Sequence, residues 1–254
     1  MDQSSIRRGV PCWYLVDELG LDAVNDAFLL EHVAYELINM HFRNTRYYSD
    51  LLDLFLDMAR KTAFGQCLDT LTGRKLKFEE YTMERYETTV KNKTSITTFY
   101  FPVAIAAIIS NVDYQMFLDK LEEIAVNLGL LFQVLDDYLD CFGSSAETGK
   151  DGTDIQNGKC SWLFVRSKEL CSVDQLSELY ENYGQQDELK IARVLKIYEA
   201  LNMSKLVHEF TENTIKSTVK LIEQFENVDL KFLFYQPLER FAKQLNTELS
   251  TFLV

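Results

Sequence analysis

Hydrophobic residues recur along most of the chain at intervals of three and four, the spacing that places side chains on one face of an α-helix. In segment 22–41 the pattern includes Phe28, Val33 and Leu37, and segment 47–71 repeats it ahead of Gly73, a residue type that often ends helices. The same periodicity predicts helices over 78–91, 94–110, 114–142, 153–167, 173–183, 187–201, 204–226 and 237–253. No segment keeps a period of two. The sequence therefore predicts an all-α fold, a bundle of more than four helices around a common interior.

The composition is that of one large folded unit. Of the 254 residues 47% are hydrophobic, and the ten glycines and three prolines form no stretch typical of a linker. We therefore expect a single domain over residues 1–254. The 39 acidic residues outnumber the 26 basic ones, and the net charge of -13 argues against a partner nucleic acid bound through general electrostatics.

The cysteines and the hydrophobic runs bear on where the protein works. The five cysteines are widely spaced and include no CxxC pair, which is typical of reduced thiols in an intracellular protein. The most hydrophobic run, 99–109, is shorter than the roughly 20 residues that cross a bilayer. We expect a soluble, cytoplasmic protein without a membrane span.

The stretch LGLLFQVLDDYLDCFG carries the clearest candidate chemistry. Asp136 and Asp140 are four residues apart and share one face of the predicted helix, with Asp137 beside them. Like charges at this spacing repel each other, and a divalent cation removes the conflict. Mg²⁺ prefers one or two carboxylates together with water and substrate phosphates. The alternative is a solvated acidic face near the end of a helix.

A glycine-rich stretch follows this helix. In TGKDGTDIQNGKCSW the glycines let the backbone approach a ligand closely, and Lys150 and Lys159 could bind phosphate near Asp154. An ordinary surface loop has the same composition. The position directly after the acidic helix favours a site.

Two further polar groups lie on otherwise hydrophobic helices. Lys91 and Lys93 precede a hydrophobic helix in YETTVKNKTSITTFYFP, where a charged helix junction is the alternative. Gln66 and Asp69 in GQCLD share one helix face among hydrophobic neighbours. Such a pair needs polar partners, either in a structural network or in a site.

Taken in order, the motifs RRGxxCWY, GQxLD, YxxxVKxKT, FQxxDDYLD and GKxGTDIQxxKCSW resemble the trans-isoprenyl diphosphate synthases, most closely the farnesyl and geranyl diphosphate synthase branch. The resemblance extends from Asp2 to Trp162. It implies a helical fold with a central active-site cavity, a homodimer, and three Mg²⁺ ions per site. It also implies that dimethylallyl or geranyl diphosphate is ionised to an allylic cation and condensed with isopentenyl diphosphate.

The same resemblance implies a role for each motif residue. Asp136 and Asp140 hold Mg²⁺, with Asp137 and Asp154 in the same metal group. Arg8 contacts isopentenyl diphosphate. Arg7, Lys93 and Lys150 clamp the allylic diphosphate, and Asp154 and Lys159 support the same end of the cavity. Thr94 and Gln133 line the carbocation path. Asp2, Gln66 and Asp69 form the opposite metal group.

Three features depart from the family pattern. Leu135 stands where a second glutamine is usual, and Thr97 where a tyrosine is usual. Asp2 occupies the last position of the family's first motif, DDxMD, with Met1 at the methionine. We therefore expect a truncated chain that is inactive alone. Two other functions stay open: a class I terpene synthase derived from this family, and a non-catalytic helical protein that pairs with a full-length subunit.

Overall fold

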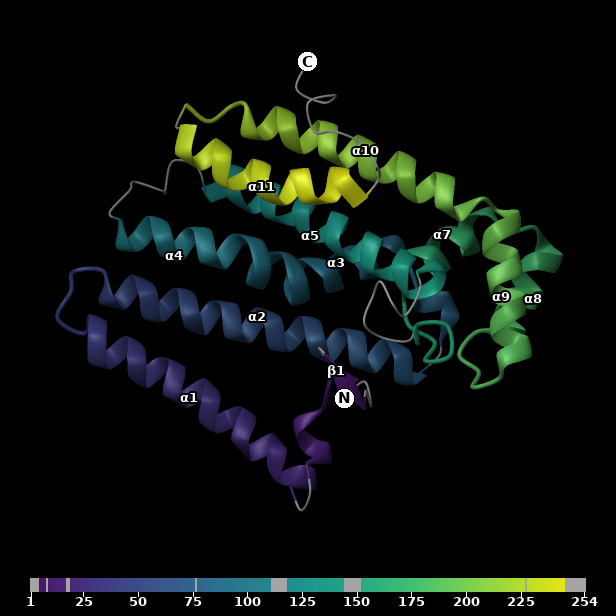
Figure 1. The fold of residues 1–254 in the computed structure, drawn as a ribbon, viewed down its shortest axis with the longest axis horizontal. Helices are drawn as coiled ribbons and strands as arrows, with labels where there is room; N and C mark the ends of the chain where they lie inside the picture. The colour runs from purple at the N-terminus through teal and green to yellow at the C-terminus, as the bar shows by residue number, and fades with distance from the viewer. Residues whose placement is uncertain are drawn as a thin grey trace.

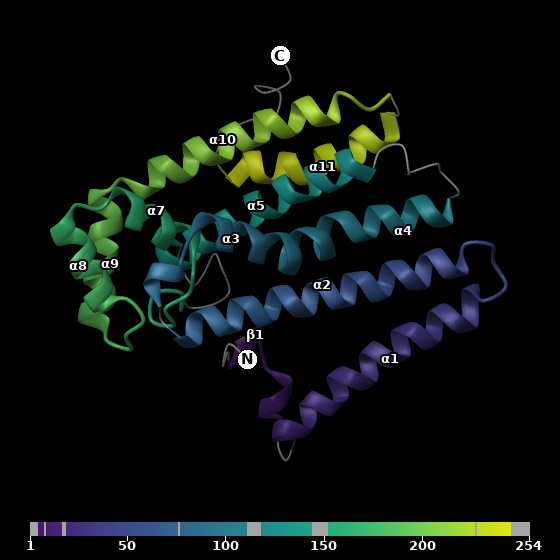
Figure 2. The same cartoon turned by 180° about the vertical axis from the view of Figure 1, so that it is seen from behind.

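Long helices packed side by side make up most of the computed structural model (Figures 1 and 2). It describes residues 5–7, 9–16, 19–75, 77–110, 118–143, 152–226 and 228–244. The helices are α1 (Ala23–Phe42), α2 (Tyr48–Lys75), α3 (Met83–Val90), α4 (Phe101–Ile109), α5 (Leu118–Phe142), α7 (Trp162–Leu170), α8 (Val173–Asn182), α9 (Glu188–Ala200), α10 (Met203–Ile222) and α11 (Val228–Gln244). The predicted all-α class is confirmed.

Shorter elements connect these helices. A π-helix, η4 (Lys91–Tyr100), runs directly from α3 into α4, and there are 3-10 turns η1 (Trp13–Leu15), η2 (Gly20–Asp22) and η3 (Phe78–Glu80). A small antiparallel hairpin pairs β1 (Ile6–Arg7) with β2 (Val10–Pro11). Gly9 supplies the positive φ of +76° that its turn requires. Strands of two residues are too short to show a periodicity in the sequence.

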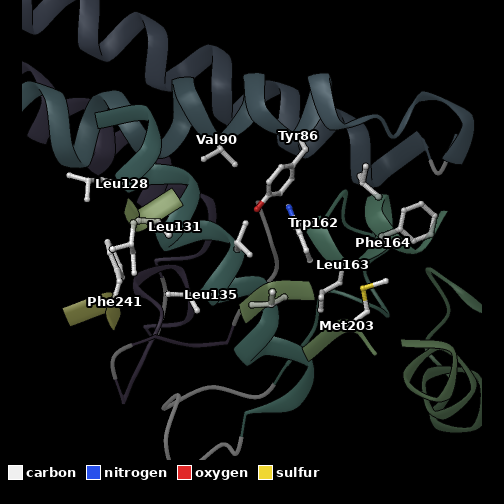
Figure 3. Packing of buried hydrophobic residues seen from close by; sticks show 14 of the residues in the cluster. Tyr86, Val90, Leu128, Leu131, Leu135, Trp162, Leu163, Phe164, Met203 and Phe241 are labelled. Carbon is white, nitrogen blue, oxygen red and sulfur yellow. The ribbon is translucent and has the colours of Figure 1, made fainter. Parts of the chain in front are cut away.

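Helix α5 lies at the centre of the largest hydrophobic core. Its side chains Leu121, Ile124, Leu128, Leu131 and Val134 are at most 1% exposed and follow the three- and four-residue spacing of a helix face. They pack with residues of α3, α7, α10 and α11, among them those labelled in Figure 3. Burying each such side chain contributes about 1.5–3 kcal/mol relative to leaving it exposed. The apolar face of α5 therefore determines where its polar end is held.

Short polar side chains begin several helices. The Thr82, Ser161 and Ser172 hydroxyl oxygens each accept a hydrogen bond from the backbone N–H three residues later. Asp187 accepts two such bonds at the start of α9. These contacts satisfy N–H groups that have no partner within the helix.

The predicted helix over 153–167 is wrong in its first half. Residues 154–158 form turns, and α7 begins only at Trp162. Gly158 has a φ of +61°, which takes the backbone out of the helical conformation, and Ser161 caps the new helix. The apolar spacing across this segment comes from a loop and a helix that pack against the same core.

The predicted helix over 237–253 also differs from the structure. Helix α11 begins at Val228 and continues through Pro237, and residues 245–254 lie outside the described part of the chain. Proline favours the first turn of a helix, which suggested a start there. Apolar residues Phe234, Leu238 and Phe241 on both sides of Pro237 are buried and keep the helix intact.

Across the described ranges, the helices all fall short of the length and hydrophobicity that a membrane crossing requires.

Candidate functional site

At the acidic end of α5, the adjacent residues Asp136 and Asp137 lie in different surroundings. Asp136 and Asp140 are partly exposed, whereas Asp137 is 0% exposed. The Asp137 Oδ1 atom accepts a hydrogen bond from Gln133 Nε2 at 2.9 Å, and its Oδ2 atom accepts one from the Trp162 backbone N–H at 2.8 Å. One carboxylate is therefore held inside the protein, while the pair four residues apart lies toward solvent.

Residues 152–161, here called the 152–161 loop, pass close to this end of α5. The Asp140 Oδ2 atom accepts hydrogen bonds from the backbone N–H groups of Thr153 and Asp154 at 2.9 and 2.8 Å. A Cβ atom on Gly152 would lie 1.8 Å from the Asp140 carbonyl oxygen, so a glycine is needed for this approach. The loop thus orients the Asp140 carboxylate.

The Lys159 ammonium lies among several carboxylates. Its Nζ atom is 3.2 Å from Asp154 Oδ2 and 3.6 Å from Asp137 Oδ1. Burial lowers the pKa of Lys159, but the charges of Asp154, Asp137, Asp69 and Asp136 outweigh burial and raise it well above its usual value. Burial raises the pKa of Asp154 to about 7, although Lys159 opposes that shift. Lys159 is the cation that balances this acidic cluster.

The π-helix η4 connects the cluster to α2. Lys93 Nζ lies 2.5 Å from Asp69 Oδ2 on α2, and the adjacent Thr94 donates from Oγ1 to Gln133 Oε1 on α5 at 3.4 Å. Consecutive residues of η4 therefore contact helices on two sides. Gln66 donates from Nε2 to Thr70 Oγ1 on its own helix at 3.1 Å.

Two glycines allow η4 to lie this close to its neighbours. A Cβ atom on Gly65 of α2 would lie 2.5 Å from the backbone nitrogen of Lys93. A Cβ atom on Gly129 of α5 would lie 2.0 Å from Ser95 Oγ. Larger residues at either position would separate the helices, so these glycines bring Lys93 within reach of Asp69 and Thr94 within reach of Gln133.

The structure brings most of the predicted site residues into one region. The connected residues are Asp69, Lys93, Thr94, Gln133, Asp136, Asp137, Asp140, Asp154 and Lys159. Gln66 lies one turn before Asp69 on α2. Asp2, Arg8 and Lys150 fall outside the described residues, and Arg7 is described as the end of β1.

Several supporting residues were not predicted from the sequence. Tyr81 Oη lies 2.7 Å from the Gly158 carbonyl oxygen and 2.9 Å from that of Thr72, and Tyr183 Oη donates to the Lys159 carbonyl oxygen at 2.8 Å. These tyrosines contact backbone carbonyls distant in sequence, so no motif indicates them.

Tyr86 also belongs to this supporting group. Its side chain points from α3 toward Trp162 (Figure 3). Burial, and then the charge of Asp137, raise the pKa of Tyr86. Tyr86 is the first residue of the motif YxxxVKxKT, which is the signal that could have identified it.

The donor set suits a metal that is shared with a ligand. Among the described residues, no three or more His, Cys, Asp or Glu side chains are grouped so that they could hold a metal ion by themselves. Mg²⁺, however, binds through one or two carboxylates together with phosphate oxygens and water. Asp136 and Asp140, on adjacent turns at the partly exposed end of α5, fit that mode of binding.

A family model and full-length relatives both place this chain in one protein family. A family model described as polyprenyl synthetase matches residues 1–201. The farnesyl pyrophosphate synthase of Saccharomyces cerevisiae is 40% identical over 228 residues, which cover 89% of this chain and 65% of that protein. The Bos taurus farnesyl pyrophosphate synthase is 42% identical over 227 residues, covering 89% of this chain and 64% of that protein. This chain therefore spans slightly less than two thirds of the length of these two relatives.

A solved structure agrees with the sequence relatives. The structure of T. brucei farnesyl diphosphate synthase in complex with a bisphosphonate matches with a TM-score of 0.85 and 30% identity, covering 98% of this chain and 88% of that one. The family match extends over most of the chain and includes the motifs whose residues meet around α5. The chain belongs to the polyprenyl synthetase family.

Proposed function

We propose that this chain is part of a short-chain prenyltransferase of isoprenoid biosynthesis. The enzyme condenses dimethylallyl or geranyl diphosphate with isopentenyl diphosphate and yields geranyl or farnesyl diphosphate. The observation that carries the proposal is the position of the Asp136 and Asp140 carboxylates beside a loop that supplies Lys159, in a family whose relatives are named farnesyl pyrophosphate synthases.

The proposed reaction places specific demands on these residues. Heterolysis of the allylic carbon–oxygen bond leaves a diphosphate with concentrated negative charge, which cations must stabilise. Asp136 and Asp140 would hold Mg²⁺, which neutralises that charge when bound, and we expect three such ions per site. Lys93 and Lys159 add fixed positive charges from η4 and the 152–161 loop.

The allylic cation requires different neighbours from those of the diphosphate. Thr94 donates its hydroxyl hydrogen to Gln133 Oε1, which leaves the hydroxyl lone pairs to stabilise positive charge along the chain of the substrate. Residues close to Gln133 on α5, among them Leu131 and Val134, are hydrophobic and buried, and they would help to exclude water, which would otherwise react with the cation. Helix α5 thus carries acidic residues at its C-terminal end and buried hydrophobic residues along the turns before them.

The metal proposal predicts a joint effect of Mg²⁺ and a diphosphate on thermal stability. Mg²⁺ with pyrophosphate or a bisphosphonate should raise the melting temperature, and either component alone should do little, because the metal bridges carboxylate and phosphate oxygens. Asp136→Ala should abolish the joint shift in differential scanning fluorimetry. Asp53→Ala removes an exposed carboxylate on a different helix, α2. It is the matched control and should retain the joint shift. An unchanged shift in Asp136→Ala would contradict the metal assignment.

Product analysis tests the reaction itself. Of the motif DDxMD this sequence contains only Met1 and Asp2, so the assay uses the chain fused behind the N-terminal segment of the Saccharomyces cerevisiae relative. Incubation with Mg²⁺, geranyl diphosphate and isopentenyl diphosphate should yield a longer prenyl diphosphate. A hydrocarbon or terpene alcohol would instead identify a terpene synthase. The absence of any product from a folded fusion would support a non-catalytic pairing subunit.

We also propose that two copies of the chain pair through α1. Both views show α1 at the edge of the molecule beside α2 (Figures 1 and 2). Its outer stripe of hydrophobic side chains is between 48% and 72% exposed: Leu29, Leu30, Val33, Leu37 and Met40. A continuous stripe of exposed hydrophobic side chains on a helix is typical of an interaction surface. A second copy of the chain presents the same surface for a two-fold contact.

Sedimentation velocity at micromolar concentration should show a dimer. Val33→Glu places a charge within the stripe and should convert the dimer to a monomer, because burying an unpaired carboxylate is costly. Asn213→Glu, at an exposed position of α10 far from α1, is the control and should leave the dimer intact. A wild-type monomer would contradict the proposed pairing.

A further inference from the structure

Asp137 differs from its two neighbours in the DDYLD motif. Protein donors contact both of its carboxylate oxygens, and its side chain is fully buried. Mg²⁺ could reach it only by displacing Gln133, Lys159 or the Trp162 N–H. The Trp162 N–H, enclosed at the start of α7, has little access to water as a replacement acceptor. The contacts of Asp137 are those of a structural anchor.

The contacts of Asp137 also connect it to the loop that orients Asp140, one of the two partly exposed carboxylates. Asp137 lies 3.6 Å from Lys159 Nζ, which lies 3.2 Å from Asp154 Oδ2. The backbone N–H of Asp154 in turn donates to Asp140 Oδ2 at 2.8 Å. Asp137 also accepts from Trp162, the residue that follows the 152–161 loop. The buried Asp137 carboxylate therefore contacts both the Lys159 side chain within the loop and Trp162 directly after it. The same loop orients Asp140.

We propose that Asp137 is a positioning residue that holds Lys159 and the 152–161 loop in place, and that it does not ligate metal. This inference rests on the proposed function for the ligand, a diphosphate bound with Mg²⁺. It divides the motif into two tasks: Asp136 and Asp140 face the ligand, and Asp137 fixes the cation and the loop beside them. Adjacent identical residues thus have different roles because they lie on different sides of α5.

Two isosteric variants separate these roles. In Asp137→Asn the amide oxygen still accepts one hydrogen bond, but the amide NH₂ group faces another donor, so the loop should loosen. Amide hydrogen exchange over residues 152–162 should become at least about tenfold faster in the absence of ligand. In Asp136→Asn, which is our metal-ligand variant, exchange over the same residues should stay at the wild-type rate.

Pyrophosphate binding supplies the second measurement, by titration calorimetry at several Mg²⁺ concentrations. Asp137→Asn should weaken pyrophosphate binding about tenfold, the usual effect of losing a supporting contact, without changing the Mg²⁺ concentration of half-maximal binding. Asp136→Asn should raise that Mg²⁺ concentration or abolish binding. Lys159→Met should weaken pyrophosphate binding more than Asp137→Asn does, because it also removes a positive charge beside the ligand. The double variant should be little weaker than Lys159→Met, because Asp137 acts on the ligand mainly through Lys159.

The outcomes distinguish the inference from the proposed function. A raised Mg²⁺ requirement in Asp137→Asn with unchanged loop exchange would show that Asp137 is a metal ligand and would overturn the inference. Failure of the wild type to bind pyrophosphate with Mg²⁺ would contradict the proposed function, while loop exchange would still decide whether Asp137 holds the loop. If circular dichroism shows that Asp137→Asn does not fold, Lys159→Met, which retains the Trp162 contact, is used for the exchange measurement. Unchanged exchange over residues 152–162 in Lys159→Met would then overturn the inference.

Discussion

Replacing Lys159 with methionine is expected to lower the free energy of unfolding by about 3–5 kcal/mol at pH 8. The substitution removes the cation between the Asp137 and Asp154 carboxylates, which are 0% and 7% exposed. Methionine fills a similar volume, so the loss arises mainly from the two buried charges. Urea denaturation measures it, and Lys196→Met, an exposed lysine of α9, is the control that should change stability little.

The cost of Lys159→Met should decrease as the pH falls. Burial already raises the pKa of Asp154 from 3.8 to about 7 with Lys159 present, and loss of Lys159 removes the opposing effect and raises that pKa further. A carboxyl with a raised pKa in the folded state binds a proton there before it does in the unfolded chain. Folding of the variant therefore becomes more favourable from pH 8 toward pH 5, and less favourable as pH rises through the folded-state pKa. If Lys159→Met lowered the free energy of unfolding equally at pH 8 and pH 5, the result would contradict the buried contact between Lys159 and Asp154.

Gly65→Ala is expected to destabilise the protein although alanine is the better helix former. Helix propensity alone predicts a gain of about 1 kcal/mol. The added Cβ atom, however, would lie 2.5 Å from the Lys93 nitrogen and 2.8 Å from the Asn92 carbonyl carbon, both backbone atoms of η4. Separating α2 from η4 should cost about 1–3 kcal/mol and weaken the Lys93–Asp69 pair.

The sign of the stability change is the test for Gly65→Ala. Urea denaturation should give a lower free energy of unfolding than wild type. Ala63→Gly, at an exposed position of the same helix, measures the propensity difference and should cost about 1 kcal/mol. A Gly65→Ala variant more stable than wild type would show that α2 and η4 do not approach as closely as the structure indicates.

Much of the fold could be predicted because helical periodicity is local. The predicted segments 22–41 and 47–71 correspond to α1 and α2, and 114–142 corresponds to α5, with ends that differ by a few residues. Segment 153–167 failed because the conformation of Gly158 and the contacts of the 152–161 loop with Tyr81 and Tyr183 depend on distant parts of the chain.

The sequence by itself determined that Asp136 and Asp140 share a face of α5, because a spacing of four residues is nearly one helical turn and needs no other part of the chain. It also determined, through motif order, the group of residues that meets there. Only the tertiary structure decided that Asp137 turns away from its neighbours to Trp162 and Lys159. Those contacts join residues 25 and 22 positions apart, and they form only when the 152–161 loop and α7 pack against α5.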